Sequence, residues 1–160
     1  MAIDTTACLS FAALASGTVV EETAREEGFK TCADALELVA GAAIADHKHS
    51  SHNHWHTDQT DGRMFTSLVS KYYSDGDGHV TITAAPVSSG NCDATYVETF
   101  ALERNCMSAR ENIYDDWEFM TELNDTIVLQ SESGGVNLYL TPQGSGNICL
   151  VSRREVVYFD

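Results

Sequence analysis

Ser74-Asp-Gly-Asp-Gly-His-Val-Thr-Ile-Thr-Ala-Ala85 is the stretch at which the character of this chain changes. Its first five residues form turns readily, and the rest alternate between apolar and polar side chains with the two-residue period of a half-buried strand. Helix-like periodicity precedes this stretch and strand-like alternation follows it. The pattern predicts an α+β fold, with N-terminal helices (about 5–75) packed on a C-terminal antiparallel β-sheet (about 79–160). At 160 residues, we expect 1–160 to be a single domain.

Four segments before this stretch have the features of helices. We expect one helix at about 5–16, a second at about 19–27 and a third after an N-cap at Thr31. The third has an apolar face made of Leu36, Val39, Ala40, Ala43 and Ile44. A fourth is expected after an N-cap at Thr60 or Asp61, with an apolar stripe of Phe65, Leu68, Val69 and Tyr72.

The second half of the chain contains short runs rich in β-branched residues or with alternating polarity. Strands are expected at 79–85, 95–103, 117–123, 126–130, 136–141, 148–152 and 155–159. A short helix is expected at 105–114, and Ser152-Arg-Arg-Glu155 is interpreted as a turn between the last two strands. Connections this short require antiparallel neighbours.

The charge of the chain limits its partners. Twenty-four Asp and Glu against nine Lys and Arg give a formal net charge of −15, which repels nucleic acid and anionic lipid surfaces. No stretch reaches the roughly 20 apolar residues of a transmembrane segment. The apolar run from Ala7 to Val20 lacks the basic start of a signal peptide, so it is interpreted as a buried helix. The binding partners that the sequence leaves open are a metal ion and another protein.

Five cysteines are many for a reduced protein of this size, and none lies in a Cys-x-x-Cys pair. Structural disulfides in an oxidising compartment are the better explanation, which predicts a secreted or periplasmic protein whose signal peptide has been removed. Connectivity cannot be deduced from sequence. The preferred pairing joins Cys92 to Cys106 and Cys8 to Cys32, and leaves Cys149 over.

A histidine-rich loop is expected at 46–58, between the third and fourth helices. Five of the six histidines of the chain lie in ten residues there. Imidazole is a preferred protein ligand of zinc, copper and nickel, and a nearby carboxylate can add an oxygen ligand. The candidate metal ligands are His47, His49, His52, His54, His56 and Asp58.

Two arrangements of these ligands are open. In an extended segment His52, His54 and His56 would point the same way, whereas in a helix His49, His52 and His56 would share a face. Ser50, Ser51 and Asn53 lower the helix propensity and favour the extended form. Because a loop supplies little of the rigidity that catalytic zinc needs, capture, buffering or delivery of a metal is favoured over hydrolysis.

Other functions stay open beside metal binding. The histidines could be incidental, in a solvated loop of a secreted interaction module or inhibitor that uses its sheet face or acidic surface. They could also sense protons, because imidazoles gain charge near pH 6.5. Nothing in the sequence brings Cys149 and His79 together as a nucleophilic pair, and no known catalytic motif occurs, so an enzyme ranks third.

Overall fold

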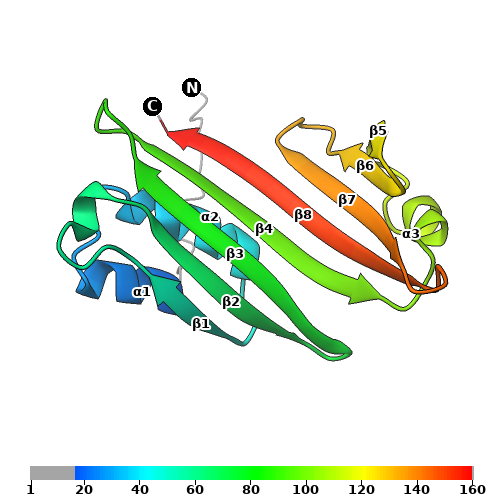
Figure 1. The fold of residues 1–160 in the computed structure, drawn as a ribbon, viewed down its shortest axis with the longest axis horizontal. Coiled ribbons are helices and arrows are strands. Elements are labelled where there is room, and N and C mark those ends of the chain that lie inside the picture. The colour runs from blue at the N-terminus through cyan, green and yellow to red at the C-terminus, as the bar shows by residue number, and fades with distance from the viewer. Residues whose placement is uncertain (1–16, 160) are drawn as a thin grey trace, which may run out of the picture.

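The computed structural model describes residues 17–159, which form a mixed α+β structure with three α-helices and one eight-stranded sheet (Figure 1). The helix expected at 5–16 and the expected partner Cys8 lie outside the described residues. The helices are α1 (Val19–Glu26), α2 (Ala33–Ile44) and α3 (Cys106–Asn112), with a short 3-10 turn, η1 (Thr60–Gly62). The strands are β1 (His49–His54), β2 (Phe65–Tyr73), β3 (Gly76–Pro86), β4 (Cys92–Leu102), β5 (Glu118–Leu123), β6 (Thr126–Gln130), β7 (Val136–Gln143) and β8 (Ile148–Phe159).

The sheet consists of two four-stranded meanders joined side by side. Its order is β1-β2-β3-β4-β8-β7-β6-β5, and every neighbouring pair is antiparallel. The joint is the long pairing of β4 with β8, in which Cys92 lies opposite Phe159 and Leu102 opposite Cys149. The expectation of an antiparallel sheet is therefore confirmed, and β1 and β5 are its two edges.

All three helices cover the same face of the sheet, at opposite ends of β4 and β8. Alternate residues of β4 point to one face, and these supply two separate hydrophobic clusters. Cys92, Ala94 and Tyr96 pack with α1 and α2, whereas Phe100 and Leu102 pack with the cluster around α3. Figure 1 shows α1 and α2 behind β1 to β4, with α3 near β7. The middle of this helix-covered face lies between the two clusters.

The fourth expected helix is wrong, because residues 65–73 form β2. Phe65 and Val69 are fully buried, while Leu68 and Tyr72 of the predicted stripe are exposed on the other face. A spacing of four residues suits one face of a helix and also one face of a strand, so Phe65 and Val69 alone do not choose between them. Pairing of β2 with β1 and β3 decides in favour of the strand.

The expected turn at 152–155 is also wrong, because 148–159 is one continuous strand. Arg153 and Arg154 point to opposite faces of β8. Arg153 lies over the ring of Tyr96 on the helix-covered face, and Arg154 lies over Tyr139 on the helix-free face. Long aliphatic stems and stacking on aromatic rings let both arginines sit within a sheet.

Both expected disulfides need correction. The structure joins Cys32 to Cys92, with Cα atoms 5.6 Å apart, and Cys106 to Cys149, at 4.9 Å. Cys92 begins β4 and Cys106 follows its end, so an extended strand separates them by roughly 33 Å, far beyond the reach of a disulfide. One bond ties the start of α2 to the sheet and the other ties α3 to β8. Cys149 is therefore structural rather than left over.

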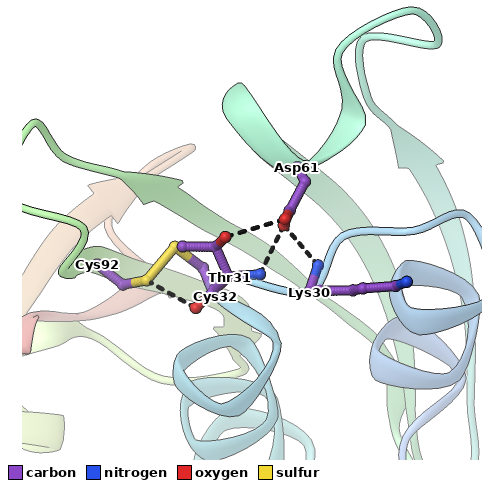
Figure 2. The surroundings of a disulfide bond; sticks show 5 residues. All are labelled: Lys30, Thr31, Cys32, Asp61 and Cys92. Carbon is purple, nitrogen blue, oxygen red and sulfur yellow. Dashed lines mark hydrogen bonds between the residues drawn. A yellow bond between two sulfur atoms is a disulfide. The ribbon is translucent and has the colours of Figure 1, made fainter.

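Asp61 holds the connection between α1 and α2 next to the first disulfide (Figure 2). Its Oδ1 accepts the backbone N–H groups of Lys30, at 2.6 Å, and Thr31, at 2.5 Å, and its Oδ2 accepts the Thr31 hydroxyl at 3.0 Å. The Cys92 sulfur lies 3.4 Å from the Thr31 carbonyl oxygen, a contact without a donated proton because the thiol is oxidised. The residue that caps α2 is Cys32, so the N-cap predicted at Thr31 is wrong by one position.

We predict that Asp61→Asn lowers the free energy of unfolding at pH 7 by about 1 kcal/mol. The substitution removes the charge of a carboxylate that accepts hydrogen bonds from Lys30 and Thr31, and the site is partly exposed. Hydrogen bonds from Thr31 hold the pKa of Asp61 below its usual value. The stabilisation is therefore complete above about pH 4 and is lost as pH falls through the lower folded pKa. Urea unfolding across pH 2 to 7 measures it. Asp58→Asn, in the same exposed loop, is the control, and a cost independent of pH would contradict the prediction.

Candidate functional site

The histidine-rich segment is not a loop between two helices but mainly an edge strand. Residues His49–His54 form β1, which pairs with β2 so that His52 lies opposite Leu68 and His54 opposite Thr66. The segment therefore connects α2 to β2. The serines and asparagine that lower its helix propensity are compatible with this edge position, where one side of the backbone is paired and the other is open.

Alternation along β1 divides the histidines between two faces of the sheet. His52 and His54 are exposed on the helix-free face, and their rings meet edge to face with centroids 4.8 Å apart. His49 points the other way and is half-buried. Its Nδ1 lies 2.8 Å from the His47 carbonyl oxygen, to which it donates, and its Nε2 is buried with no hydrogen-bond partner in residues 17–159. The extended arrangement predicted for this segment thus places His52 and His54 together.

The remaining candidate ligands lie on either side of β1. The ring of His47 packs against Tyr73, with centroids 4.8 Å apart. His56 and Asp58 are exposed beyond the end of the strand. Trp55, between His54 and His56, stacks on Phe65, at 5.9 Å and 13° between the rings, so it is held by the hydrophobic core.

His54 and His56 both line a shallow hollow next to Trp55. The hollow has a volume of about 400 Å³, and Arg63, Met64 and Thr66 form its other walls. Within residues 17–159, no three side chains of His, Cys, Asp or Glu lie close enough to hold a metal ion as they stand. The structure therefore brings His52 and His54 together as a pair and places His56 at the hollow that His54 also lines. It keeps His47 and His49 apart from them.

A second candidate site lies in the uncovered middle of the helix-covered face. We call this site the central cleft; its volume is about 390 Å³. It is lined by Lys71, Tyr73, Glu98, Phe100, Tyr114, Trp117, Leu138 and Arg153. Clefts of this size with aromatic walls and a few polar groups are typical small-molecule sites.

A buried ion pair forms one wall of the central cleft. Lys71 and Glu98 are each 5% exposed, and Lys71 Nζ lies 2.8 Å from Glu98 Oε1. Lys71 also donates to the Ala43 carbonyl oxygen at 2.7 Å, near the C-terminus of α2. The Tyr73 hydroxyl donates to the same Glu98 oxygen at 2.5 Å. The carboxylate therefore has two donors, as a buried charge requires.

The side chains of β2 reach Glu98 across a glycine of β3. A Cβ atom at Gly78 would lie 2.9 Å from Tyr73 Cε2, so only glycine lets the tyrosine ring cross this strand without displacement. The sequence from Tyr73 to Ala84 resembles part of a calcium loop but lacks its first and last ligands. The structure instead shows a two-residue turn, in which Tyr73 lies opposite Gly76.

The tyrosines around the central cleft are hydrogen-bond donors at neutral pH. Burial raises the pKa of Tyr96 to about 12. Burial and the hydrogen bond to Glu98 raise the pKa of Tyr73, and burial does the same for Tyr114. These hydroxyls therefore stay protonated at neutral pH, and that of Tyr73 already donates its proton to Glu98.

Sequence reasoning missed the central cleft. A signal for it existed, because Tyr96 and Glu98 fall in phase with the buried residues of β4, and Lys71 with those of β2. A charged residue at an inward strand position is costly unless it is paired, which makes it worth noticing. The helix expected over residues 65–73 hides the signal at Lys71, because a helical spacing does not place it with the buried residues.

Comparisons with known proteins add nothing to the description of these two sites. No helix among the described residues is long and apolar enough to cross a membrane. No family model, no curated protein and no solved structure matches the chain.

Proposed function

We propose that this chain captures transition-metal ions at the exposed face of β1, with His52 and His54 as the first two ligands. The observation that carries the proposal is the contact between these two exposed imidazoles on an edge strand, at 4.8 Å between ring centroids. Two neutral imidazoles that leave the other coordination positions open form a bidentate site. Both histidines belong to β1, so the backbone pairing of β1 with β2 holds them at this spacing, which a flexible loop would not do.

His56 is the proposed third ligand. It follows His54 by two residues and lines the same hollow, and the strand ends before it, so its backbone can adjust. Asp58 is the candidate oxygen ligand or hydrogen-bond acceptor beyond it. Zinc, copper and nickel all accept nitrogen ligands with an added oxygen ligand. Copper(II) is expected to bind most tightly, because a given site generally binds copper(II) more strongly than nickel(II) or zinc(II).

Capture or delivery suits this geometry better than catalysis. A solvent-exposed site with two placed ligands exchanges its metal readily and has no buried cleft or positioned base. Two disulfides are typical of proteins from oxidising compartments, which supports a secreted or periplasmic setting for this function. The high negative charge of the chain, −15, attracts cations to such a surface.

We predict that the double variant His52→Ala/His54→Ala binds copper(II), zinc and nickel at least about 10-fold more weakly than the native chain, because both placed nitrogen ligands are lost. Untagged protein, purified without an immobilised-metal column, is titrated by isothermal calorimetry. Its metal content after purification is measured by elemental mass spectrometry.

Two control variants separate a defined site from general affinity for histidine. His79→Ala removes an exposed histidine of β3, outside the tract, and should change the affinity less than twofold. His49→Ala removes the inward-facing histidine and should also leave metal affinity nearly intact. If His49→Ala weakened binding as much as the double variant, the metal would be wrapped by the whole tract. If no variant changed the titration, the proposal would be wrong.

A protein-interaction module is the second candidate function, and the helix-free face of the sheet favours it. Leu68, Tyr72, Val156 and Tyr158 are exposed there, with Tyr158 at 72%. Exposed apolar and aromatic side chains of this kind occur at protein interfaces. One comparison distinguishes the two functions, because the His52→Ala/His54→Ala variant loses metal capture but keeps binding of a protein partner.

A further inference from the structure

The central cleft contains a cation that no carboxylate neutralises. Among residues 17–159, no Asp or Glu oxygen lies within ion-pair distance of Arg153, and its Nε is buried without a hydrogen-bond partner. Its guanidinium lies over the ring of Tyr96, 5.8 Å from the centroid. A buried donor without a partner is costly, so such a group is a reason to look for a ligand.

The carboxylate closest in register to Arg153 is already taken. Glu98 lies directly opposite Arg153 in the pairing of β4 with β8, yet its Oε1 accepts from Lys71 and Tyr73 instead. The three ionised groups of the central cleft are two cations and one anion, which leaves a net charge of +1. In a chain whose formal net charge is −15, this is an unusual place for surplus positive charge.

The other walls of the central cleft are apolar and aromatic. Phe100 comes from β4, Leu138 from β7, and Tyr114 and Trp117 from the segment between α3 and β5. The rings of Tyr114 and Trp117 meet edge to face, with centroids 6.2 Å apart. They supply flat apolar surface next to the charged end of the cleft, in a volume of about 390 Å³. A ligand that fits must therefore have an anionic end and an apolar body.

We propose that the central cleft binds a small carboxylate with an aromatic or aliphatic body, in which the carboxylate pairs with Arg153 and the body lies against Phe100, Tyr114 and Trp117. The planar guanidinium matches a carboxylate with two parallel hydrogen bonds. A single negative charge balances the net charge of the cleft, whereas a phosphate dianion would leave a surplus beside Glu98. This site is independent of His52 and His54, which lie on the helix-free face of β1.

The test uses 4-phenylbutyrate as the probe, and its neutral analogue 4-phenylbutanamide as the matched ligand. Isothermal calorimetry with the full chain should show that the carboxylate binds at least about 10-fold more tightly than the amide, since charged hydrogen bonds are about twice as strong as neutral ones. In a Trp55→Phe background Trp117 is the single tryptophan, so its fluorescence should change on binding with the same affinity.

Two neighbouring arginines supply the variant and its control. Arg153→Met keeps the length and apolar stem but removes the charge, and should weaken phenylbutyrate binding at least about 10-fold while weakening amide binding much less. Arg154→Met, one residue away on the opposite face, should change neither. Arg153→Lys keeps the charge and loses the planar pair of donors, so it should weaken the carboxylate several-fold in a chain that still folds.

The proposal is overturned by either of two results. One is phenylbutyrate binding to Arg153→Met or Arg153→Lys with native affinity. The other is the absence of both heat and a Trp117 fluorescence change up to millimolar probe. Both results leave the proposed metal site at His52 and His54 unaffected, because its titration uses a different ligand and different variants.

Discussion

Replacing Lys71 with methionine is expected to lower the free energy of unfolding by about 3–5 kcal/mol, because it leaves the Glu98 carboxylate buried without its cation. Methionine has similar length and fills similar space, so the loss reports the charge rather than a cavity. Lys71 also donates to the Ala43 carbonyl oxygen, and that acceptor near the end of α2 loses its partner as well. Urea unfolding with intact disulfides, followed by circular dichroism, measures the change.

The control for Lys71→Met is the double variant Lys71→Met/Glu98→Gln, in which neither charge remains. It should recover a large part of the lost stability, because replacing both members of a buried pair with neutral groups is often nearly neutral. Lys48→Met, at an exposed lysine one residue before β1, should cost less than about 0.5 kcal/mol. A single variant and a double variant of equal stability would show that Glu98 does not need its cation.

Removing the disulfide between Cys32 and Cys92 by the double substitution to alanine is expected to cost about 4 kcal/mol. The bond closes a sequence separation of 60 residues, and in the chain-entropy model that constraint on the unfolded state is worth this amount. Both cysteines are buried in the larger hydrophobic cluster, so some packing is lost in addition. The midpoint and slope of urea unfolding give the change in free energy.

The second disulfide is the internal comparison for the first. The bond between Cys106 and Cys149 spans 43 residues, and the same model gives about 4 kcal/mol for it as well. A larger measured cost for the first bond would therefore report the packing of α2 on β4 rather than loop length. A cost below about 1 kcal/mol for either bond would contradict the entropic account.

Several elements could be predicted from local pattern because they depend on neighbouring residues in the chain. The helix expected at 19–27 is found at Val19–Glu26, where Thr18 caps it because its hydroxyl oxygen accepts a hydrogen bond from the Glu21 N–H. The strand expected at 126–130 is β6, with the same bounds. Each of these has a cap or a turn beside it, and such signals act within four residues.

The wrong predictions of secondary structure lie where the same sequence pattern is compatible with two kinds of element. The residues from Phe65 to Tyr73 have apolar side chains at spacings of three and four, which favoured a helix, while their burial alternates in the structure. The segment from Ile148 to Phe159 contains two adjacent arginines, which favoured a turn. In both places the backbone pairs with strands that are close in space, and a pattern read along one segment carries no information about that pairing.

The candidate sites also depend partly on the sequence and partly on strand pairing. The dense histidine tract is visible in the sequence as a set of possible ligands, but only the pairing of β1 with β2 separates His52 and His54 from His49. The central cleft joins Lys71, Glu98 and Arg153 from three strands, and their meeting depends on the order of strands in the sheet.

The residues alone were sufficient for the α+β class, the antiparallel sheet, the oxidised cysteines and the concentration of imidazoles, because composition and short-range periodicity carry these properties. The disulfide partners, the faces on which the histidines lie and the unpaired Arg153 followed from the pairing of β4 with β8 and from helices placed at both ends of one face. Those features arise from contacts between residues tens of positions apart, and burial in a shared core selects such contacts among many that local preferences would allow equally.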